Sequence, residues 1–375
     1  MPKSTSDLRI RSIKPLVSPA ALEAELPLDG PGADFVAGAR REIAAVLSGG
    51  DDRILVVVGP CSIHDTAAAL EYARLLKAAA DKHGGDLLVA MRVYFEKPRT
   101  TIGWKGLIND PNLDGTYEIN RGVRLARGLM AGITALRLPV ATEFLDTILG
   151  QYFADLVSWG AIGARTVESQ VHRELASGLS MPVGFKNRSD GDVRVAVEAM
   201  VSARQPHWFP SLARSGAPAV MGTSGNDQTH VVLRGGAGGP NFGAEQVAAA
   251  VALLRKAGLP PHVMVDCSHA NSGKDAGRQP EVAAEIAARV AGGDRSICAV
   301  MLESNLVGGS QDYRARPLVH GQSVTDACLS WEKTAPVLAL LAEAVRARRL
   351  KRQGRPARPS GNTFRSVRSP SARLE

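Results

Sequence analysis

Eight short apolar runs, separated by longer segments with helical periodicity, constrain the fold of this chain more than any other feature. The runs are residues 54–58, 87–93, 135–141, 161–164, 183–185, 230–233, 262–265 and 297–302. Each run is apolar almost throughout, which is typical of strands buried on both faces of a parallel sheet. Eight strand–helix units predict an α/β fold of the (β/α)8 TIM barrel type. An open doubly wound sheet is the alternative, because the order of strands in space cannot be read from sequence.

The segments between the runs carry signals for helix starts and ends. Asp65 is placed to cap a helix, and Pro280 is placed to start one. Gly258 and Pro260 predict the end of another helix, over residues 247–254. Residues 337–345 have the spacing of a final amphipathic helix.

Two regions interrupt this repeat. Residues 1–50 precede the first strand, and prolines at 15, 19, 27 and 31 are expected to limit helix there, although 34–47 fits one. Residues 208–230 become polar and glycine-rich, which predicts an inserted β-hairpin near the sixth strand. The expected domains are an N-terminal extension (1–50) with oligomer or effector contacts, a catalytic barrel (51–350) and a disordered basic tail (351–375).

The positive charge is concentrated at the C-terminal end. The formal net charge is +8, but ten Lys or Arg and one acidic residue lie from Arg346 onward, which leaves −1 for the rest. The end of the chain is rich in Pro, Ser, Gly and Arg and is therefore expected to be disordered and solvated. Binding of this tail to nucleic acid is the alternative, but the tail lacks interleaved aromatic residues.

The sequence has neither the pattern of a membrane span nor that of a secreted protein. The chain contains no run of about 18 apolar residues, and its charged N-terminus does not resemble a signal peptide. The four cysteines, at positions 61, 267, 298 and 328, have neither zinc-motif spacing nor the density of a disulfide scaffold. A cytoplasmic protein is expected.

Charged residues follow the predicted strands, where a barrel places its catalytic groups. Six of them are cationic: Arg92, Lys97, Arg99, Arg165, Lys186 and Arg234. Any one alone would more often be a surface ion-pair residue. Six at one barrel mouth would repel one another without anions, so the site is expected to take strongly anionic ligands. Phosphate monoesters carry about −1.5 to −2 charge at pH 7, which favours phosphorylated substrates.

A second set of residues could hold a metal ion. It consists of one thiol, one imidazole and two carboxylates, from Cys61, His269, Glu303 and Asp326. These donors suit Mn, Fe, Co, Zn or Cu better than Mg or Ca, and an open position on such an ion could polarise an aldehyde oxygen. Taken singly, Cys61 fits a buried small residue and His269 a core histidine. His64, Asp266 and Glu143 are competing ligand candidates.

Five motifs together resemble the class I, metal-dependent 3-deoxy-D-arabino-heptulosonate-7-phosphate (DAHP) synthases. They are Gly-Pro-Cys-Ser-Ile-His-Asp (59–65), Lys-Pro-Arg-Thr (97–100), Gly-Ala-Ile-Gly-Ala-Arg (160–165), Gly-Phe-Lys-Asn (184–187) and Asp-Cys-Ser-His-Ala-Asn-Ser (266–272). The similarity extends over about residues 7–349. The Lys-Pro-Arg-Thr segment distinguishes this family from the related octulosonate-8-phosphate synthases.

The resemblance implies a transferase that condenses phosphoenolpyruvate with erythrose 4-phosphate in the first step of the shikimate pathway to aromatic amino acids. The C3 carbon of phosphoenolpyruvate attacks the aldehyde, water adds at C2, and phosphate leaves with C–O cleavage. Lys97 or a metal-bound group would protonate the new alkoxide, and Glu143 would orient the water.

The resemblance also assigns ligands to residues. One divalent metal ion (Mn, Fe, Co or Zn) would be held by Cys61, His269, Glu303 and Asp326. Phosphoenolpyruvate would be held by Arg92, Lys97, Arg165, Lys186 and Arg234. Arg99 and Thr100 would hold the phosphate of erythrose 4-phosphate.

Feedback control by an aromatic amino acid and assembly as a homodimer or homotetramer are also implied. The effector pocket would lie where the N-terminal segment meets a neighbouring subunit, and would use Asp7, Ile10, Gln151, Leu179, Ser180, Phe209 and Ser211. Ser211 favours phenylalanine over tyrosine, whereas Gly150 and Pro210 depart from the family pattern. Cys328 could approach Cys61 and form an inactivating disulfide, or remain an inert buried thiol.

Two other functions remain open from the residues. A synthase using another phosphorylated aldose, such as arabinose 5-phosphate, would share most of the site, and Lys-Pro-Arg-Thr (97–100) argues against it. A non-catalytic phosphosugar-binding regulator would be expected to have lost a metal ligand or a cation, and this sequence retains all of them.

Overall fold

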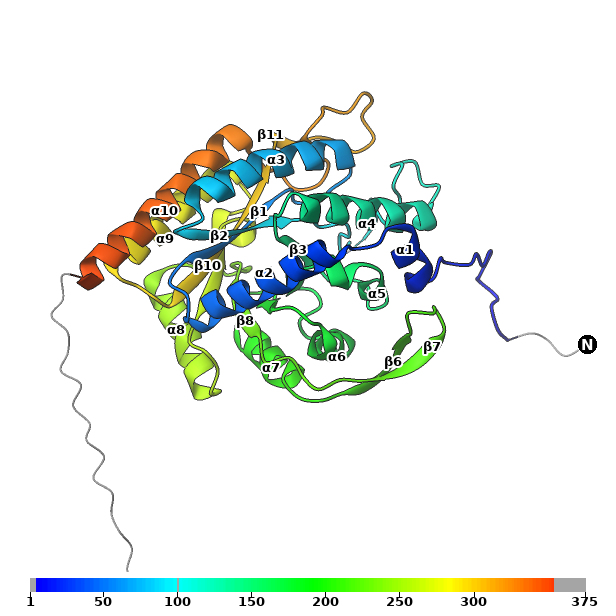
Figure 1. Cartoon of the computed structure of the whole chain (residues 1–375), viewed down its shortest axis with the longest axis horizontal. Helices are drawn as coiled ribbons and strands as arrows, with labels where there is room; N and C mark the ends of the chain where they lie inside the picture. Colours follow the sequence, from blue (N-terminus) through cyan, green and yellow to red (C-terminus); the bar gives the residue numbers. More distant parts are fainter. Residues whose placement is uncertain (1–4, 100, 354–375) are drawn as a thin grey trace, which may run out of the picture.

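A closed parallel sheet forms the centre of the molecule. The computed structural model describes residues 5–99 and 101–353, and Figure 1 shows helices surrounding the sheet. Within these residues, the barrel strands are β1 (Ile54–Gly59), β2 (Leu87–Arg92), β3 (Val140–Glu143), β4 (Trp159–Ile162), β5 (Val183–Lys186), β8 (Thr229–Leu233), β9 (Val263–Asp266) and β10 (Ile297–Asn305). They neighbour one another in this order, and β1 also pairs in parallel with β10. This closure confirms the (β/α)8 barrel and excludes the open sheet.

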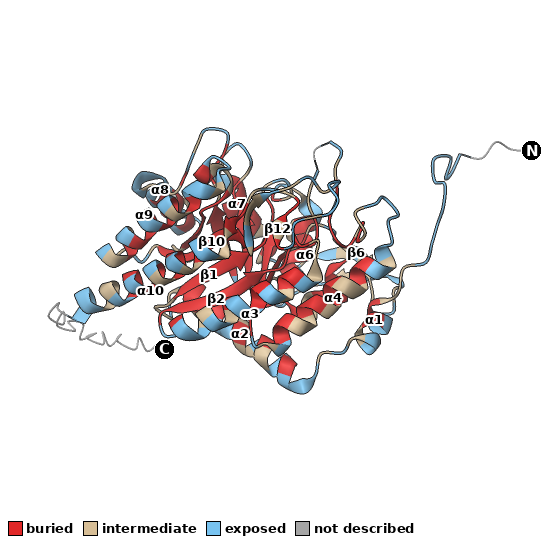
Figure 2. Cartoon of the chain, turned by 90° about the horizontal axis from the view of Figure 1, so that it is seen from above, coloured by how far each residue is buried: buried red, intermediate tan, exposed pale blue. Residues whose placement is uncertain are grey.

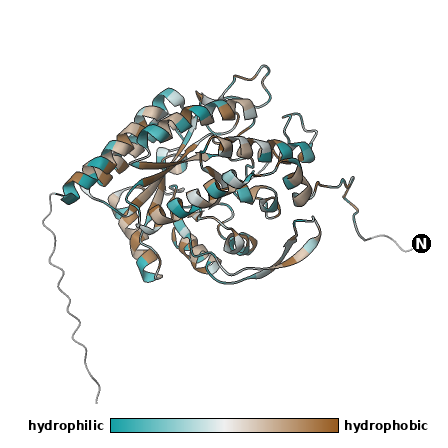
Figure 3. Ribbon diagram, in the orientation of Figure 1, coloured by the Kyte–Doolittle hydropathy of each residue, from teal (hydrophilic) through white to brown (hydrophobic). Residues whose placement is uncertain are grey.

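The strands are buried on both faces. Every residue of β1 and β2 is buried, and Figure 2 shows the central strands in red. The same strands are brown in the hydropathy view of Figure 3, whereas the helices alternate between brown and teal. Apolar runs without alternation therefore reflect a sheet covered by helices outside and filled by side chains inside.

One predicted strand began too early. The apolar run 135–141 includes the end of α4 (Ile119–Ala135), and β3 starts only at Val140. Between them Arg137 adopts a left-handed backbone conformation with φ 57°. The run thus joins the end of a helix to the start of a strand, and hydropathy alone cannot separate them.

Helices follow the strands as expected. They are α3 (Thr66–His83), α4, α5 (Gly150–Phe153), α6 (Gln170–Gly178), α7 (Arg194–Ala203), α8 (Ala244–Lys256), α9 (Gln279–Gly292) and α10 (Trp331–Gln353). The Asp65 carboxylate accepts hydrogen bonds from the Ala67 and Ala68 N–H groups at 2.8 and 3.1 Å, which confirms the predicted cap. Pro280 lies in the first turn of α9, also as predicted.

The helix expected over 34–47 is confirmed as part of a longer one, but the expectation that prolines otherwise limit helix before residue 50 is wrong. Two helices form there, α1 (Pro19–Glu25) and α2 (Gly30–Ser48), and Pro19 and Pro31 lie in their first turns. Proline is well suited to this position because the first N–H groups of a helix have no partner within it. Residues Ile43 and Val46 of α2 belong to one buried cluster with Leu55 and Val57 of β1 and with the inward-facing residues of the other barrel strands, so α2 packs against the side chains that fill the barrel.

An antiparallel ribbon lies between α7 and the sixth barrel strand, β8. It consists of β6 (Trp208–Leu212) and β7 (Pro218–Gly222), with Phe209 opposite Met221. The Ala20 N–H of α1 donates to the Arg214 carbonyl in the turn of this ribbon at 2.8 Å. Figure 1 shows the ribbon and α1 on the side of the barrel away from the end of α10.

The loop after β10 contains three short strands, β11 (Val307–Ser310), β12 (Gln322–Ser323) and β13 (Leu329–Ser330). β13 pairs with the end of β10, so this loop stays close to the barrel mouth. The predicted disordered tail falls almost entirely on residues 354–375, which lie outside the described residues. In the described part of the chain, no helix is long and apolar enough to cross a membrane.

Arg127 of α4 joins segments of the helical layer outside the barrel, and its replacement tests how much this contributes to stability. Its guanidinium is almost fully buried and makes paired hydrogen bonds of 2.7 and 2.8 Å with the Asp155 carboxylate, and another with the Leu26 carbonyl. We expect Arg127→Met to lower the free energy of unfolding by about 3 kcal/mol, because Asp155 and a carbonyl lose a buried partner.

The matched control is Arg124→Met on the same helix, whose pair with Glu25 is about 40 % exposed on both sides. We expect this exposed pair to contribute less than about 1 kcal/mol. Urea unfolding of both variants measures the difference, and equal losses would contradict the role given to Arg127.

Candidate active site

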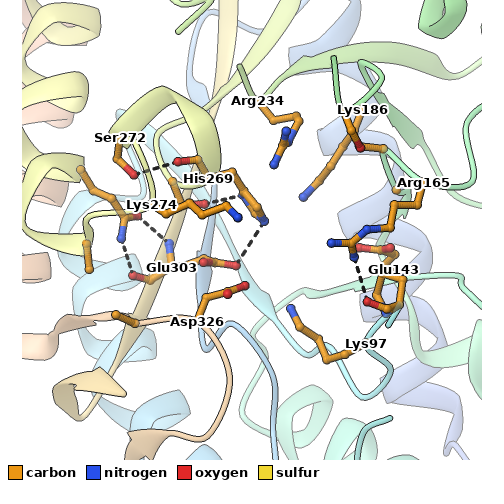
Figure 4. Close-up of a pocket in the computed structure, with 18 of the residues that line it drawn as sticks. Lys97, Glu143, Arg165, Lys186, Arg234, His269, Ser272, Lys274, Glu303 and Asp326 are labelled. Carbon is orange, nitrogen blue, oxygen red and sulfur yellow. Dashed lines mark hydrogen bonds and ion pairs between the residues drawn. The ribbon is translucent and has the colours of Figure 1, made fainter. Parts of the chain in front are cut away.

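A polar cavity of about 160 Å³ opens at the carboxyl-terminal ends of the barrel strands (Figure 4). Its charged and titratable lining residues are Lys97, Arg99, Glu143, Arg165, Lys186, Arg234, His269, Lys274, Glu303 and Asp326. Glu143 and Lys186 are the last residues of β3 and β5, and Glu303 lies near the end of β10. The barrel therefore gathers side chains that are up to about two hundred residues apart in sequence, as this fold does at its catalytic face.

Five of the six predicted cations line this cavity. Arg99, Arg165 and Arg234 form no ion pair with any described residue; Arg165, for example, donates to the Pro98 carbonyl at 2.8 Å. Burial lowers the pKa of Arg234; Asp266 opposes this, and nearby Arg165 lowers the pKa further. Cations held together without matching carboxylates leave a site that favours anions. Thr100, predicted to act with Arg99, lies outside the described residues.

The sixth cation, Arg92, does not lie at the barrel mouth, where all six cations were expected. It is fully buried and does not line the cavity. Its guanidinium bonds to Glu303 at 3.0 Å and stacks over the Tyr94 ring at 4.0 Å from the centroid. Arg92 thus lies beneath the cavity, where it holds a cavity-lining carboxylate, and its contact with phosphoenolpyruvate stays a prediction.

Three of the four predicted metal ligands form a tight cluster. Ligand atoms of Cys61, Glu303 and Asp326 all lie within 4.8 Å of one another. The Cys61 thiol donates to Asp326 at 3.4 Å, and the Lys97 ammonium donates to the Cys61 sulfur at 3.0 Å. A thiol beside two carboxylates is a set of donors that a divalent transition metal would bind.

His269 lies at the edge of this cluster. Its Nε2 atom is 3.8 Å from Glu303, while its Nδ1 atom is 2.9 Å from Asp266 and 2.8 Å from the Ser268 hydroxyl. Partners on Nδ1 orient the ring and leave Nε2 directed at the carboxylate, an arrangement common around metal-binding histidines. His269 has φ 54°, a left-handed conformation that is uncommon outside glycine and is often found at functional sites.

The thiol of Cys61 is in an environment that disfavours its anion. Burial raises the pKa of Cys61 to about 11; Glu303 raises it as well, and Lys97 opposes both. Burial also opposes ionisation of Asp326, but Lys97 and the bond from Cys61 lower its pKa overall. A bound divalent cation would supply the positive charge that a thiolate needs here.

Contacts between two loops bring Asp326 to Cys61. The Ser62 and Thr325 hydroxyls are 2.6 Å apart, and the Cys61 N–H donates to the Cys328 sulfur at 3.4 Å. Both thiols are free and buried, so the predicted disulfide between them stays a prediction.

The competing ligand candidates lie elsewhere or are already engaged. His64 does not line the cavity. Asp266 is fully buried and bonds to Lys186, His269 and Ser268; although burial opposes it, His269 and Lys186 hold its pKa well below the usual range. Glu143 faces the cavity beside Gly163, where an added Cβ would lie 2.3 Å from its carboxylate, so this glycine makes room for Glu143.

Sequence reasoning missed several lining residues, above all Lys274. It lines the cavity with Ser272 and Gln279, and Figure 4 shows it beside His269. Lys274 has φ 65°, and its N–H donates to the His269 carbonyl at 2.6 Å. Its place five residues after His269, in the loop beyond the seventh strand, was a signal that could have identified it.

The predicted effector residues are only partly brought together. A cavity of about 740 Å³ between α2, α5, α6 and the ribbon is lined by Gln151, Leu179, Ser180 and Phe209. Ser211 does not line it, and Asp7 and Ile10 lie in an exposed N-terminal segment.

Comparisons with known proteins agree with this geometry. Residues 33–339 match the DAHP synthetase I family. The chain is 54% identical over 344 residues to a Phe-sensitive phospho-2-dehydro-3-deoxyheptonate aldolase of Escherichia coli K12, covering 92% of this chain and 98% of that protein. It is 53% identical over 348 residues to a tyrosine-inhibited one of Schizosaccharomyces pombe, covering 92% and 94%.

A solved structure is also similar. The phospho-2-dehydro-3-deoxyheptonate aldolase of Francisella tularensis SCHU S4 superposes with a TM-score of 0.89 at 55% identity, covering 90% of this chain and 99% of that one. The motifs, the closed barrel, the cationic cavity and these matches lead to one conclusion: the chain belongs to the DAHP synthetase I family.

Proposed function

We propose that this protein is a DAHP synthase, which joins phosphoenolpyruvate to D-erythrose 4-phosphate with release of phosphate. The observation that carries the proposal is one cavity that holds unpaired cations beside a thiol–carboxylate cluster. Such a cavity suits two phosphorylated substrates, one of which has an aldehyde to be activated. The family match and the names of the relatives support the same activity.

Phosphoenolpyruvate is assigned to the cations on the far side of the cavity from the Cys61 cluster. Arg165, Lys186 and Arg234 lie across the cavity from Glu303 and Asp326 (Figure 4). The Lys97 ammonium contacts the Cys61 sulfur at 3.0 Å. Arginine forks fit phosphate and carboxylate oxygens, while Lys186 and Lys97 act as compact charges. Arg99 and Thr100 would hold the phosphate of the aldose.

One divalent metal ion, Mn, Fe, Co or Zn, would be held by Cys61, His269, Glu303 and Asp326. The fit rests on the mixed sulfur, nitrogen and oxygen donors, and on a buried thiol whose pKa is about 11 without a cation. When bound, the ion would supply Lewis-acid polarisation of the aldehyde oxygen.

The chain's own groups carry the remaining steps. The cations hold the phosphate and carboxylate of phosphoenolpyruvate so that C3 faces the aldehyde carbon. The Lys97 ammonium, 3.0 Å from the Cys61 sulfur, is placed to give its proton to the new alkoxide. The Glu143 carboxylate is placed to orient the water that adds at C2, after which phosphate leaves with cleavage of its C–O bond.

The direct test measures how fast phosphoenolpyruvate is consumed in the presence of either erythrose 4-phosphate or arabinose 5-phosphate. We expect consumption with erythrose 4-phosphate at a kcat/KM far above that with arabinose 5-phosphate, because the Lys97–Thr100 segment matches the first activity. A preference for arabinose 5-phosphate would favour the alternative synthase. Tight binding of both sugars without consumption would favour a non-catalytic regulator.

Replacement of the thiol tests the metal site. We expect Cys61→Ser to lose bound metal and nearly all activity, because a neutral hydroxyl is a poor substitute for a thiolate. Metal content per chain and turnover are measured together. Cys298→Ser is the control, since Cys298 is equally buried but lies at the start of β10. Unchanged metal content in Cys61→Ser would refute its assignment as a ligand.

Replacement of Arg99 tests which substrate it binds. Arg99→Ala removes a charge-assisted phosphate contact of about 1.5–3 kcal/mol, which corresponds to a rise of roughly 10- to 150-fold in the KM for erythrose 4-phosphate. The KM for phosphoenolpyruvate is expected to stay within about twofold. Lys105→Ala is the control, an exposed cation of the same loop that does not line the cavity. An effect confined to phosphoenolpyruvate would reverse the assignment.

An aromatic amino acid is proposed as feedback inhibitor, bound in the cavity beside the ribbon. Phe209 and Leu179 offer apolar surface there, and Gln151 and Ser180 offer hydrogen bonds. Asp7, Ile10 and Ser211 would complete the pocket only with a neighbouring subunit of a homodimer or homotetramer. Relatives of nearly equal identity are named Phe-sensitive and tyrosine-inhibited, so overall identity does not select the effector.

Turnover in the presence of each aromatic amino acid tests this proposal. We expect phenylalanine to inhibit most strongly, because Ser211 favours it. Ser180→Phe should abolish inhibition, because the added ring would occupy the part of the cavity beside Leu179. Ser215→Phe, on the exposed turn of the ribbon, is the control. If no aromatic amino acid slows the wild-type enzyme, the effector proposal is wrong.

A further inference from the structure

A separate cationic cavity of about 500 Å³ lies at the opposite end of the barrel, and we call it the basal cavity. Its charged lining residues are Asp52, Arg295, Arg348, Arg349, Lys351 and Arg352. Asp52 and Arg295 each precede a barrel strand by two residues, at the amino-terminal ends of β1 and β10. The other four residues belong to the last turns of α10.

Most of its positive charge has no carboxylate partner. Asp52 is the single carboxylate on the described lining, against five cations, which leaves +4. That carboxylate is already used by Arg349, with Nε at 3.1 Å and Nη2 at 2.5 Å, and Arg349 also bonds to Asp86 at 2.7 Å. One cation is therefore neutralised, and the others face the cavity without a counter-charge.

The remaining cations have no ion pair with any described residue. Arg348 donates to the Asp52 backbone carbonyl, and burial lowers its pKa; Asp52 opposes this, and Arg295 lowers the pKa further. For Arg295, Lys351 and Arg352, no ion pair forms within the described chain.

Two nearby acidic residues do not compensate this charge. Asp51 is bonded to Arg53 at 2.7 Å, and Asp294 to Arg289 at 2.6 Å. The carboxyl-terminal ends of α9 and α10 contribute partial negative charges of about −0.5 each, which still leaves roughly +3.

We propose that the basal cavity binds a small ligand carrying two or more phosphate groups. A net charge of roughly +3 calls for more than one phosphate, since a monoester carries about −1.5 to −2. Arginine forks match phosphate oxygens in geometry as well as charge. A cavity of 500 Å³ is in the size range of small-molecule sites, which run from about 300 to 1,000 Å³.

The lining favours a small ligand over a nucleic-acid strand. Strand-binding sites combine a cationic groove with aromatic side chains on which bases stack. None of the residues lining the basal cavity is aromatic.

The test is calorimetric titration of the full-length protein with inorganic tripolyphosphate, with saturating phosphoenolpyruvate present to occupy the catalytic cavity. We expect one bound tripolyphosphate per chain. The triple variant Arg295→Gln/Arg348→Gln/Arg352→Gln should weaken it at least about 30-fold, with kcat unchanged. Arg255→Gln/Lys256→Gln is the control, because these exposed cations also end a helix but lie outside the basal cavity.

Several results would overturn the proposal. They are no binding to wild-type protein, equal weakening in the control pair, or tighter binding of a single-stranded RNA that is lost in the triple variant. Should the triple variant fail to fold, Lys351→Gln and Arg352→Gln are the substitutes, since both side chains are exposed; an affinity unchanged in both would equally refute the site. Truncation after Gln353 should leave one bound tripolyphosphate per chain, and complete loss of binding would move the site to residues 354–375.

Discussion

The contact between the Lys97 ammonium and the Cys61 sulfur, at 3.0 Å, is the interaction on which the active site depends. Lys97 is one of the cations that favour anionic ligands, and Cys61 belongs to the thiol–carboxylate cluster that could bind a metal ion. The contact therefore joins the two parts of the site. Burial and Glu303 raise the pKa of Cys61, whereas Lys97 and a bound cation favour the thiolate. Arg92 supports the same cluster from below through its buried pair with Glu303. The donors and the cations therefore stabilise one another, and loss of either set would leave uncompensated buried charge.

The barrel makes this arrangement possible because it brings the carboxyl-terminal ends of all its strands to one rim. Cys61, Lys97, Glu303 and Asp326 come from three different loops and a strand, yet the closure of β1 onto β10 places the first and last of these segments side by side. The Ser62–Thr325 contact then fixes the loop that carries Asp326. The basal cavity at the opposite rim is cationic as well, but its described lining contains no cysteine and a single carboxylate, Asp52, so it does not offer the same donors.

Much of this could be predicted from the sequence, because the relevant signals are local. Apolar runs without alternation predicted the buried parallel strands, and charged residues after those runs predicted the contents of the cavity. The direction of the Arg92 side chain could not be predicted. Because β2 is apolar on both faces, its sequence does not show which residues point into the barrel and which point outward. Arg92 consequently points into the barrel and bonds to Glu303, whereas it was expected at the mouth. Asp266 was weighed as a metal ligand, and only the structure shows it holding His269 and Lys186. The left-handed turn that directs Lys274 into the cavity depends on the tertiary fold, although the position of Lys274 in the loop beyond the seventh strand was a signal for it.

The proposed function requires that the Cys61 cluster hold a metal ion without which the condensation does not proceed. The most direct measurement is phosphate release from phosphoenolpyruvate and erythrose 4-phosphate by one preparation before chelation, after chelation and after Mn²⁺ is returned, with metal content determined at each stage. We expect release to fall to the background rate in metal-free protein and to recover in proportion to the metal bound. Undiminished release by protein shown to contain no metal would contradict this requirement.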